Sequence, residues 1–279
     1  MSGRDPDQPG PVWPPSLWIS PTKLKTFSTC PHRVRLQYID KVPSPQPFNL
    51  FLQQGTIAHN MLADAAKRIR SGVALRSADE LLVWATRGMH PQYFPSPDAR
   101  ESAAQTIVRW VQYGIGHIDH EAEFLLIERN SSRTMPWRPA GTRLTVSTRP
   151  DLILYRTDAE GERFVEIVDY KTGSQWMDEV PPVTMRFVCK DVFQKIATDT
   201  STLRMQFTYV YLEHRETEVI ALTPEYCAMS WGKVTDTIEL MMAEREWPVR
   251  PSRLCNYCPY NGSTCTAFAE MEPESAADW

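Results

Sequence analysis

The sequence predicts an α/β fold in which a strand-rich centre is flanked by helices. Apolar residues recur at helical spacing up to about residue 115, alternate at strand spacing after about residue 121, and return to helical spacing near residue 225. Cysteines lie near both ends of this pattern. The 279 residues are enough for one large domain, which we expect to span residues 19–268.

The helical segments carry clear start and periodicity signals. Ser20 followed by Pro21 is typical of a helix start, because the hydroxyl can cap the helix and proline fits its first turn. Apolar side chains form one arc over residues 55–70, and further helices are expected near residues 78–88 and 101–115. We expect a disordered tail at residues 1–18 and a flexible acidic tail at residues 269–279. Between them we expect a helical region (55–120), a core of strands and helices (121–225) and a C-terminal helix with a cysteine segment (226–268).

The strand-rich centre contains four successive segments that are typical of strands. They are AEFLLIER, TRLTVST, DLILYR and RFVEIVDYK, and the last two are joined by TDAEGE, a good turn sequence. Residues 186–199 are then expected to be helical. LRMQFTYVYL and TEVIAL follow as a hairpin, and a helix is expected over residues 225–246.

Composition limits the classes of function. A net charge of -4 argues against a globally basic nucleic-acid coat protein, although an enzyme needs only a local basic groove. No apolar run approaches the length of a membrane span, and the N-terminus lacks the apolar core of a signal peptide, so we expect a cytoplasmic protein without a membrane contact. The sequence contains no phosphate-binding G-x-x-x-x-G-K-[ST] loop, so it has no recognisable ATPase motor of its own.

The strand FVEIVDYK carries an acid and a lysine in an otherwise apolar run. Asp169 and Lys171 are two residues apart and therefore share one face of the strand. Asp151 opens the neighbouring strand of the expected hairpin, so the two acids can lie close together across the sheet. Two converging carboxylates suit Mg²⁺ or Mn²⁺, and a nearby lysine suits metal-assisted phosphodiester cleavage.

With RPDLI before it, VEIVDYKTG resembles the nuclease motif of the RecB-like branch of the PD-(D/E)XK superfamily. The resemblance implies a restriction-endonuclease-like core with a central mixed sheet, a helical insertion and clamped termini. It also implies that Asp151 and Asp169 bind the metal, that the backbone carbonyl of Tyr170 is a further ligand, and that Lys171 is catalytic. An upstream helical histidine belongs to the same pattern, and GTIAHNML supplies His59 as a metal ligand.

The RecB-like branch also carries a glutamine followed four residues later by tyrosine, and here the sequence departs from the pattern. Gln194 lies after the lysine strand in FQKIATDT, but the residue four positions later is Thr198. Gln206 is the other candidate, in a segment typical of a strand. We assign the motif to Gln194 as a catalytic-site residue, with Lys190 and Lys195 able to serve the same contact with DNA. Trp176 is a candidate for stacking against a base.

Three cysteines cluster near the C-terminus in RLCNYCPYNGSTC. Cys255, Cys258 and Cys265 lie in a short segment with proline and glycine, where packing alone does not explain them. Cys30, in FSTCPHR, is a candidate fourth ligand. Four thiolates suit either Zn²⁺ or an iron-sulfur cluster, and the spacing leaves both open. The remaining two cysteines, Cys189 and Cys227, are expected to be buried apolar residues.

The cysteine pattern is similar to the 4Fe-4S staple of AddB and of the CRISPR-adaptation nucleases. The resemblance implies a 4Fe-4S cluster that joins the two ends of the chain, beside a Mg²⁺ or Mn²⁺ site. It implies a stand-alone DNA exonuclease of phage or bacterial recombination, repair or DNA processing, which acts on single-stranded DNA or free ends, with a separate helicase or recombinase as a partner. The alternatives are a non-catalytic DNA-binding or assembly subunit with the same fold, and a zinc-stapled structural protein.

Overall fold

The computed structural model describes residues 13–44, 50–173 and 178–267. The chain divides into two compact units where the sequence suggested one domain. We call Phe48–Ser132 with Thr148–Ser230 the central unit, and Met1–Pro47, Arg133–Ser147 and Trp231–Trp279 the terminal unit. The tail expected at residues 269–279 lies outside the described residues, as does most of residues 1–18, although Ser16–Ile19 form strand β1.

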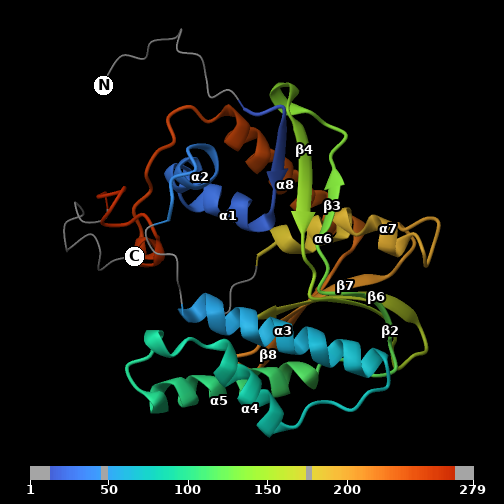
Figure 1. Ribbon diagram of the computed structural model, residues 1–279. Helices are drawn as coiled ribbons and strands as arrows, with labels where there is room; N and C mark the ends of the chain where they lie inside the picture. The colour runs from blue at the N-terminus through green and yellow to red at the C-terminus, as the bar shows by residue number, and fades with distance from the viewer. Residues whose placement is uncertain (1–12, 45–49, 174–177, 268–279) are drawn as a thin grey trace. The chain divides into compact units, whose positions relative to one another are not determined.

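A five-stranded mixed sheet forms the centre of the central unit, in the order β2-β5-β6-β7-β8 (Figure 1). The strands are β2 Glu123–Ile127, β5 Leu152–Thr157, β6 Arg163–Lys171, β7 Met205–Tyr211 and β8 Glu216–Ala221. β6 and β7 are parallel, and the other neighbouring strands are antiparallel. β6 is buried from its second to its penultimate residue, which fits its nearly continuous apolar sequence and confirms the expected mixed sheet.

Three helices cover one face of this sheet: α3 Leu50–Arg70, α4 Ala78–Gly88 and α5 Pro97–Ile115 (Figure 1). Apolar side chains of these helices share one buried core with Leu152, Val168 and Val210 of the sheet. α4 begins with a capping box, in which Ser77 and Glu80 each accept from the other's backbone N–H. The expected helices of this region are therefore confirmed, and the burial of their apolar faces fixes them on the sheet.

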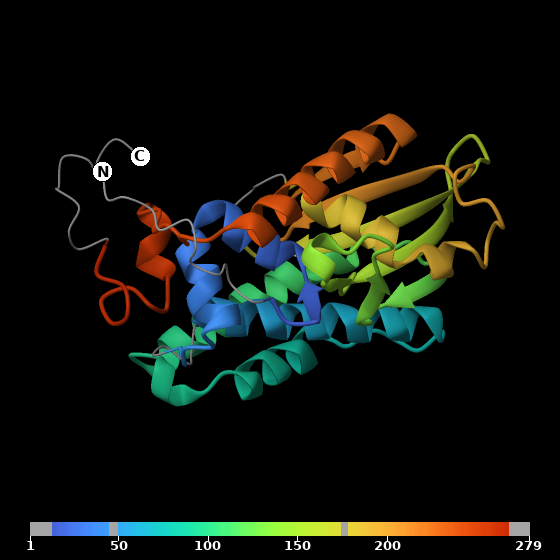
Figure 2. The ribbon, with the colours of Figure 1, turned by 90° about the horizontal axis from the view of Figure 1, so that it is seen from above.

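The other face of the sheet carries α6 (Val180–Val188) and α7 (Lys190–Phe193), which connect β6 to β7 (Figures 1 and 2). The helix expected over residues 186–199 is wrong at both ends, because α6 starts earlier and α7 ends at Phe193. The earlier start of α6 was not predicted because Pro181 and Pro182 interrupt the helical sequence pattern. They lie in the first turn of α6, where backbone N–H groups have no partner within the helix and proline therefore costs no hydrogen bond.

The terminal unit is built around a second sheet, in the order β1-β4-β3, with β4 at Arg143–Thr148 and β3 at Ser131–Thr134. β4 pairs in parallel with β1, so this strand of the sequence does not join the central sheet. The helices are α1 Pro21–Thr29, α2 Pro31–Val34 and α8 Pro224–Ala243, which begins in the central unit and ends in the terminal one. Short helical turns occupy Arg35–Ile39, Pro91–Tyr93, Pro139–Gly141 and Arg253–Tyr257.

The N-terminal and C-terminal segments of the chain are hydrogen-bonded to each other within the terminal unit. The His32 N–H donates to the Pro248 carbonyl at 3.3 Å, and the Arg250 guanidinium donates to the Ser28 carbonyl at 2.8 Å. The hydroxyl of the buried Tyr260 donates to the Val42 carbonyl at 3.1 Å. Within the described parts of the chain, every helix is too short or too polar to cross a membrane.

A buried ionic network lies on β5, β6 and β7 of the central sheet. Glu166 is 4% exposed and is ion-paired to Arg156, which also donates to Asp119 at 3.0 Å. The other carboxylate oxygen of Glu166 accepts from the Thr208 hydroxyl at 2.5 Å and from the Gln206 amide at 2.9 Å. Gln206, the second candidate for the glutamine motif, is thus engaged in this network.

We expect Glu166→Ala to lower the free energy of unfolding by about 3 kcal/mol, because it removes the buried carboxylate that pairs with Arg156 and accepts from two side chains of β7. Urea unfolding followed by circular dichroism measures the change. Glu123→Ala is the matched control, because its carboxylate is 62% exposed and lies 3.5 Å from Arg163. The control should lose at most about 0.5 kcal/mol, and equal losses in the two variants would contradict the importance of burial.

Candidate metal centre

The β5–β6 hairpin brings two acidic side chains together at one end of the central sheet. Leu152 pairs with Val168, so the same register places Asp151 opposite Asp169. Both residues are buried, at 8% and 6% exposure. One oxygen of Asp151 accepts from the Tyr170 N–H at 2.7 Å, which fixes its carboxylate against β6.

His59 of α3 reaches the same carboxylate. Its Nδ1 lies 2.8 Å from the second oxygen of Asp151, and its ring meets the Tyr170 ring edge-on at 6.5 Å. One turn earlier, Gly55 lets α3 approach the end of β6 closely. A Cβ at that position would lie 3.0 Å from the Thr172 hydroxyl, so a larger residue would require the Thr172 side chain to move.

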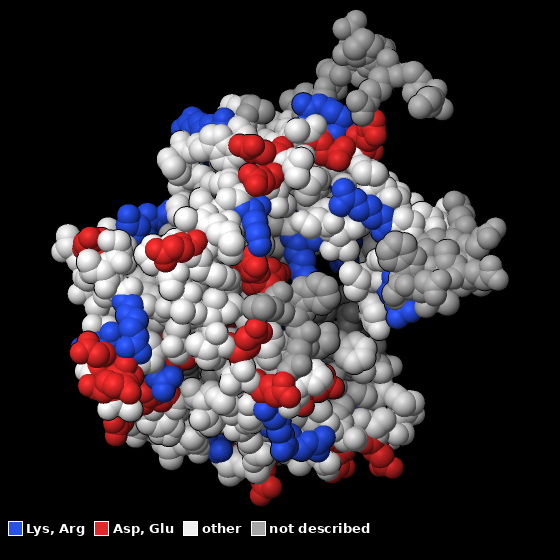
Figure 3. Space-filling model, turned by 180° about the vertical axis from the view of Figure 1, so that it is seen from behind, with Lys and Arg blue, Asp and Glu red and all other residues white. Residues whose placement is uncertain are grey.

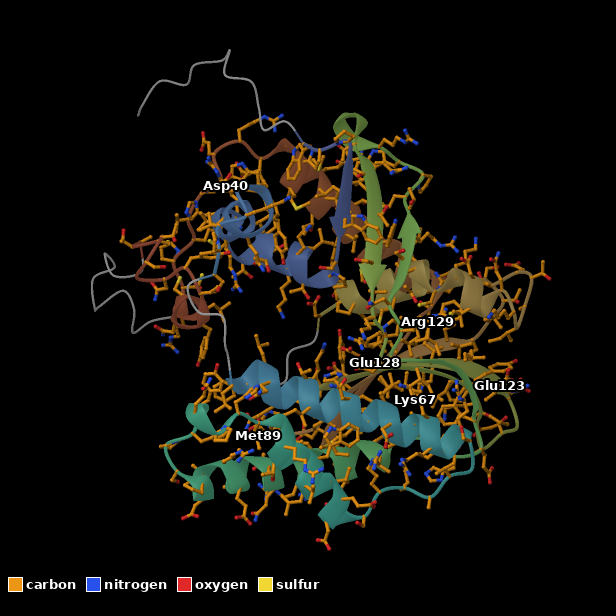
Figure 4. All side chains as sticks on the ribbon, viewed as in Figure 1. Asp40, Lys67, Met89, Glu123, Glu128 and Arg129 are labelled. Carbon is orange, nitrogen blue, oxygen red and sulfur yellow. The ribbon has the colours of Figure 1, made fainter. Side chains whose placement is uncertain are left out.

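Glu128 completes a three-residue cluster that the sequence analysis missed. Ligand atoms of His59, Glu128 and Asp151 lie within 4.8 Å of one another, the one such group of potential metal ligands found within the described residues. Glu128 follows the end of β2, above α3 (Figure 4), in the left-handed region at a φ of 44°. Its N–H donates to the Asp151 carbonyl at 2.8 Å, a contact that holds this unfavourable conformation. The available signal was an acid directly after the apolar strand β2, comparable to Asp169 near the end of the apolar strand β6.

Asp169 and Lys171 form an ion pair on the opposite face of β6 from Tyr170. The Lys171 ammonium lies 2.5 Å from Asp169 and 5.6 Å from the centre of the Tyr209 ring. This contact has the distance of an ion pair but not the angle of a directed hydrogen bond, since the same Asp169 oxygen has no hydrogen-bond partner within the described chain. The Asp169 charge also acts on Asp151 and His59, although Asp169 lies outside the three-residue cluster.

Crowded carboxylates shift the titration of the whole site. Burial would lower the pKa of His59, but the Asp151 carboxylate outweighs it and raises that pKa to about 9. Burial, reinforced by the Asp151 charge, raises the pKa of Glu128 to about 7. Burial also raises the pKa of Asp169, against the opposing effect of Lys171. These shifts indicate a site with too little positive charge for its carboxylates.

The donor set fits a hard divalent cation. Two carboxylates and one imidazole converge, a third carboxylate is close by, and oxygen-rich ligands suit Mg²⁺ or Mn²⁺. A cation would supply the positive charge that His59 supplies while it is protonated. The residues able to hold it are His59, Glu128, Asp151 and Asp169, and a ligand role for the Tyr170 carbonyl remains a prediction.

The remaining sequence candidates lie outside this cluster. Gln194 is exposed at the C-terminal end of α7, and Lys190 and Lys195 are exposed on either side of it. Trp176 lies outside the described residues. Tyr209, a buried residue of β7, donates its hydroxyl to the Asp178 carbonyl at 2.7 Å and supports Lys171 through its ring.

All four candidate cluster cysteines belong to the terminal unit. Cys30, Cys255, Cys258 and Cys265 are half-buried free thiols and line one cavity of about 240 Å³. Lys25, Arg33 and Arg250 line the same cavity, which places positive charge beside the sulfurs. Cys189 and Cys227 are buried in the central unit, as the sequence suggested.

We expect the affinity for Mn²⁺ to increase from about pH 7 to about pH 9, by up to about tenfold per pH unit. His59, with a pKa of about 9, is protonated below that pH and must lose its proton before it can bind a cation. Titration calorimetry in two buffers of different ionisation enthalpy measures the affinity and the released proton together. His214→Ala, a change in the exposed β7–β8 turn, should keep the pH dependence. Equal affinity of the native protein at both ends of the range would refute this account.

The sequence and the structure were compared with those of known proteins to identify the family of this chain. The profile of the PD-(D/E)XK nuclease superfamily matches residues 18–265. A solved structure titled "Crystal structure of SSO0001" aligns with 90% of this chain and 86% of its own, at 16% sequence identity and a TM-score of 0.36. A search of curated proteins gave no match. Because the profile covers most of its length, the chain belongs to the PD-(D/E)XK nuclease superfamily.

Proposed function

We propose that this protein is a Mg²⁺- or Mn²⁺-dependent DNA exonuclease of the RecB-like branch of its superfamily. The observation that carries the proposal is the convergence of His59, Glu128 and Asp151 beside the Asp169–Lys171 pair. Superfamily membership supports metal-dependent nuclease chemistry in general. The RecB-like assignment rests on the DYK strand combined with the upstream helical histidine.

In this proposal one group of residues holds the cation and Lys171 acts on the substrate. His59, Asp151 and Asp169, assisted by Glu128 and the Tyr170 carbonyl, hold the cation. When bound, the cation neutralises charge on the phosphodiester and polarises it toward attack by water. Lys171, fixed by Asp169 and supported by the Tyr209 ring, stabilises the negative charge that develops on the phosphate.

The proposed substrate is DNA with free or single-stranded ends. The sequence carries no motor loop, so a separate helicase or recombinase would have to supply such ends from duplex DNA. On the face shown in Figure 3, basic and acidic side chains are interspersed among the described residues. On that face, contact with DNA would therefore depend on individual cations rather than on one large basic area.

A non-catalytic DNA-binding or assembly subunit is the second candidate function. Two observations favour it: Gln194 is exposed, and Thr198 stands where the RecB-like motif has tyrosine. A subunit of this kind would bind DNA but show no turnover with Mn²⁺. The cleavage assay below separates the two candidates.

We expect end-labelled linear single-stranded DNA to be digested in the presence of Mg²⁺ or Mn²⁺. Asp169→Asn and Lys171→Ala should each lower the rate by about 100-fold or more, because each removes charge from the reacting centre. Arg163→Ala, at the far end of β6, should leave the rate unchanged. Circular single-stranded DNA should resist an exonuclease. Unchanged activity in the Asp169→Asn, Lys171→Ala double variant would exclude the proposed mechanism.

We also propose that Cys30, Cys255, Cys258 and Cys265 hold a 4Fe-4S cluster. The four thiols line one cavity of the terminal unit. The similarity of the cysteine pattern to the 4Fe-4S staple of AddB and of the CRISPR-adaptation nucleases favours the cluster over a single zinc ion. The cluster would join segments from the two ends of the chain, and the surrounding cations suit its thiolates.

Protein purified without oxygen should be brown and contain about four iron atoms per chain with matching sulfide. Cys258→Ser should lose most of the iron and loosen the terminal unit, which limited proteolysis can detect. Cys189→Ala, a buried change in the central unit, should retain the iron. A colourless protein with one zinc ion per chain would contradict the cluster and leave the nuclease proposal untouched.

A further inference from the structure

We propose that Arg149 binds a phosphate of the substrate beside the metal centre and that Glu128 orients it for this contact. The inference rests on the proposed nuclease function and adds a substrate-binding residue to it. Arg149 lies two residues before Asp151, in the segment that leads into β5. Its Nε is 2.8 Å from an oxygen of Glu128, which is itself a member of the three-residue cluster.

The Glu128 side chain is mostly buried and that of Arg149 is exposed, so a fixed carboxylate can orient an arginine that remains accessible to a phosphate. The Glu128 side chain is 10% exposed and the Arg149 side chain is 53% exposed. The ion pair is made through Nε, and an incoming phosphate would be met by the two terminal nitrogens of the guanidinium. Arginine offers paired donors in a rigid plane that match two phosphate oxygens, and a fixed side chain loses less entropy on binding.

The backbone of Glu128 supports the same orientation. Its left-handed conformation is uncommon for a residue with a side chain, and it persists through the N–H bond to the Asp151 carbonyl. The Glu128 side chain reaches both the cluster and Arg149 from this backbone position. An ordinary surface ion pair needs no such constraint and contributes little to stability, which leaves substrate binding as the better explanation.

The charge of the site gives Arg149 a role that its neighbours do not fill. The carboxylates of Glu128, Asp151 and Asp169 face the cations Lys171 and Arg149, which leaves one formal negative charge when His59 is neutral. One divalent cation makes the site positive by one charge. Without Arg149 the loaded site would be neutral, and its attraction for a phosphate would be correspondingly weaker.

The test measures DNA binding apart from cleavage. Fluorescence anisotropy with a labelled single-stranded oligonucleotide and Mn²⁺ is recorded in a Lys171→Ala background, over a range of salt concentrations. Adding Arg149→Ala should weaken binding by about tenfold and reduce the salt slope by about 0.7, the value for one lost phosphate contact on a single strand. Arg149→Lys should keep the salt slope but bind more weakly, because it keeps the charge and loses the planar fork.

Arg163→Ala is the matched control. Arg163 is 49% exposed and is likewise ion-paired to a glutamate, Glu123, at the other end of β6. The control should change the affinity by less than about twofold. If Arg149→Ala behaves like the control, or lowers affinity for Mn²⁺ instead of affinity for DNA, the inference about Arg149 is wrong. If the native protein cleaves no DNA, the proposed function fails, while the binding data still decide whether Arg149 contacts phosphate.

Discussion

The buried carboxylate of Asp151 is the constraint on which the site depends. One of its oxygens accepts from the Tyr170 N–H at 2.7 Å, and the other lies 2.8 Å from His59. Its backbone carbonyl accepts from Glu128 at 2.8 Å. One residue therefore connects β5, β6, α3 and the end of β2. A buried carboxylate without hydrogen-bond partners is unfavourable in free energy. The packing of these elements and the β5–β6 register must therefore supply the partners of Asp151.

This arrangement lowers the stability of the fold at the site that is proposed to bind the cation. Glu128 occupies a left-handed backbone conformation, and its pKa of about 7 reflects burial beside the Asp151 charge. Strain and like-charge crowding of this kind are typical of sites that bind a ligand, because the ligand relieves them. The Glu166 network on the same sheet is different. Its carboxylate is matched by Arg156, Thr208 and Gln206, which suits a purely structural role.

Much of the site follows from local sequence periodicity. The two-residue period of a strand places Asp169 and Lys171 on one face, the hairpin register brings Asp151 across, and the helical arc of residues 55–70 turns His59 toward the sheet. The fold class and most helices and strands were predictable for the same reason. Glu128 was not predicted: its place directly after an apolar strand was visible, but its left-handed conformation and its contact with the distant Asp151 are contained in no local pattern.

Other errors have equally physical causes. Prolines usually interrupt helices, yet Pro181 and Pro182 occupy a first turn where they are tolerated, so the sequence pattern placed α6 too late. β4 is typical of a strand, but only its distant partner β1 determines which sheet it joins. The division into two units follows from the same long-range pairing.

Diffraction from a crystal soaked in Mn²⁺, recorded at the manganese absorption edge, tests the central claim most directly. The account predicts an anomalous peak in contact with both His59 and Asp151, at bond lengths of about 2.0–2.3 Å. Manganese bound elsewhere in the crystal, with the His59–Asp151 hydrogen bond intact, would contradict it.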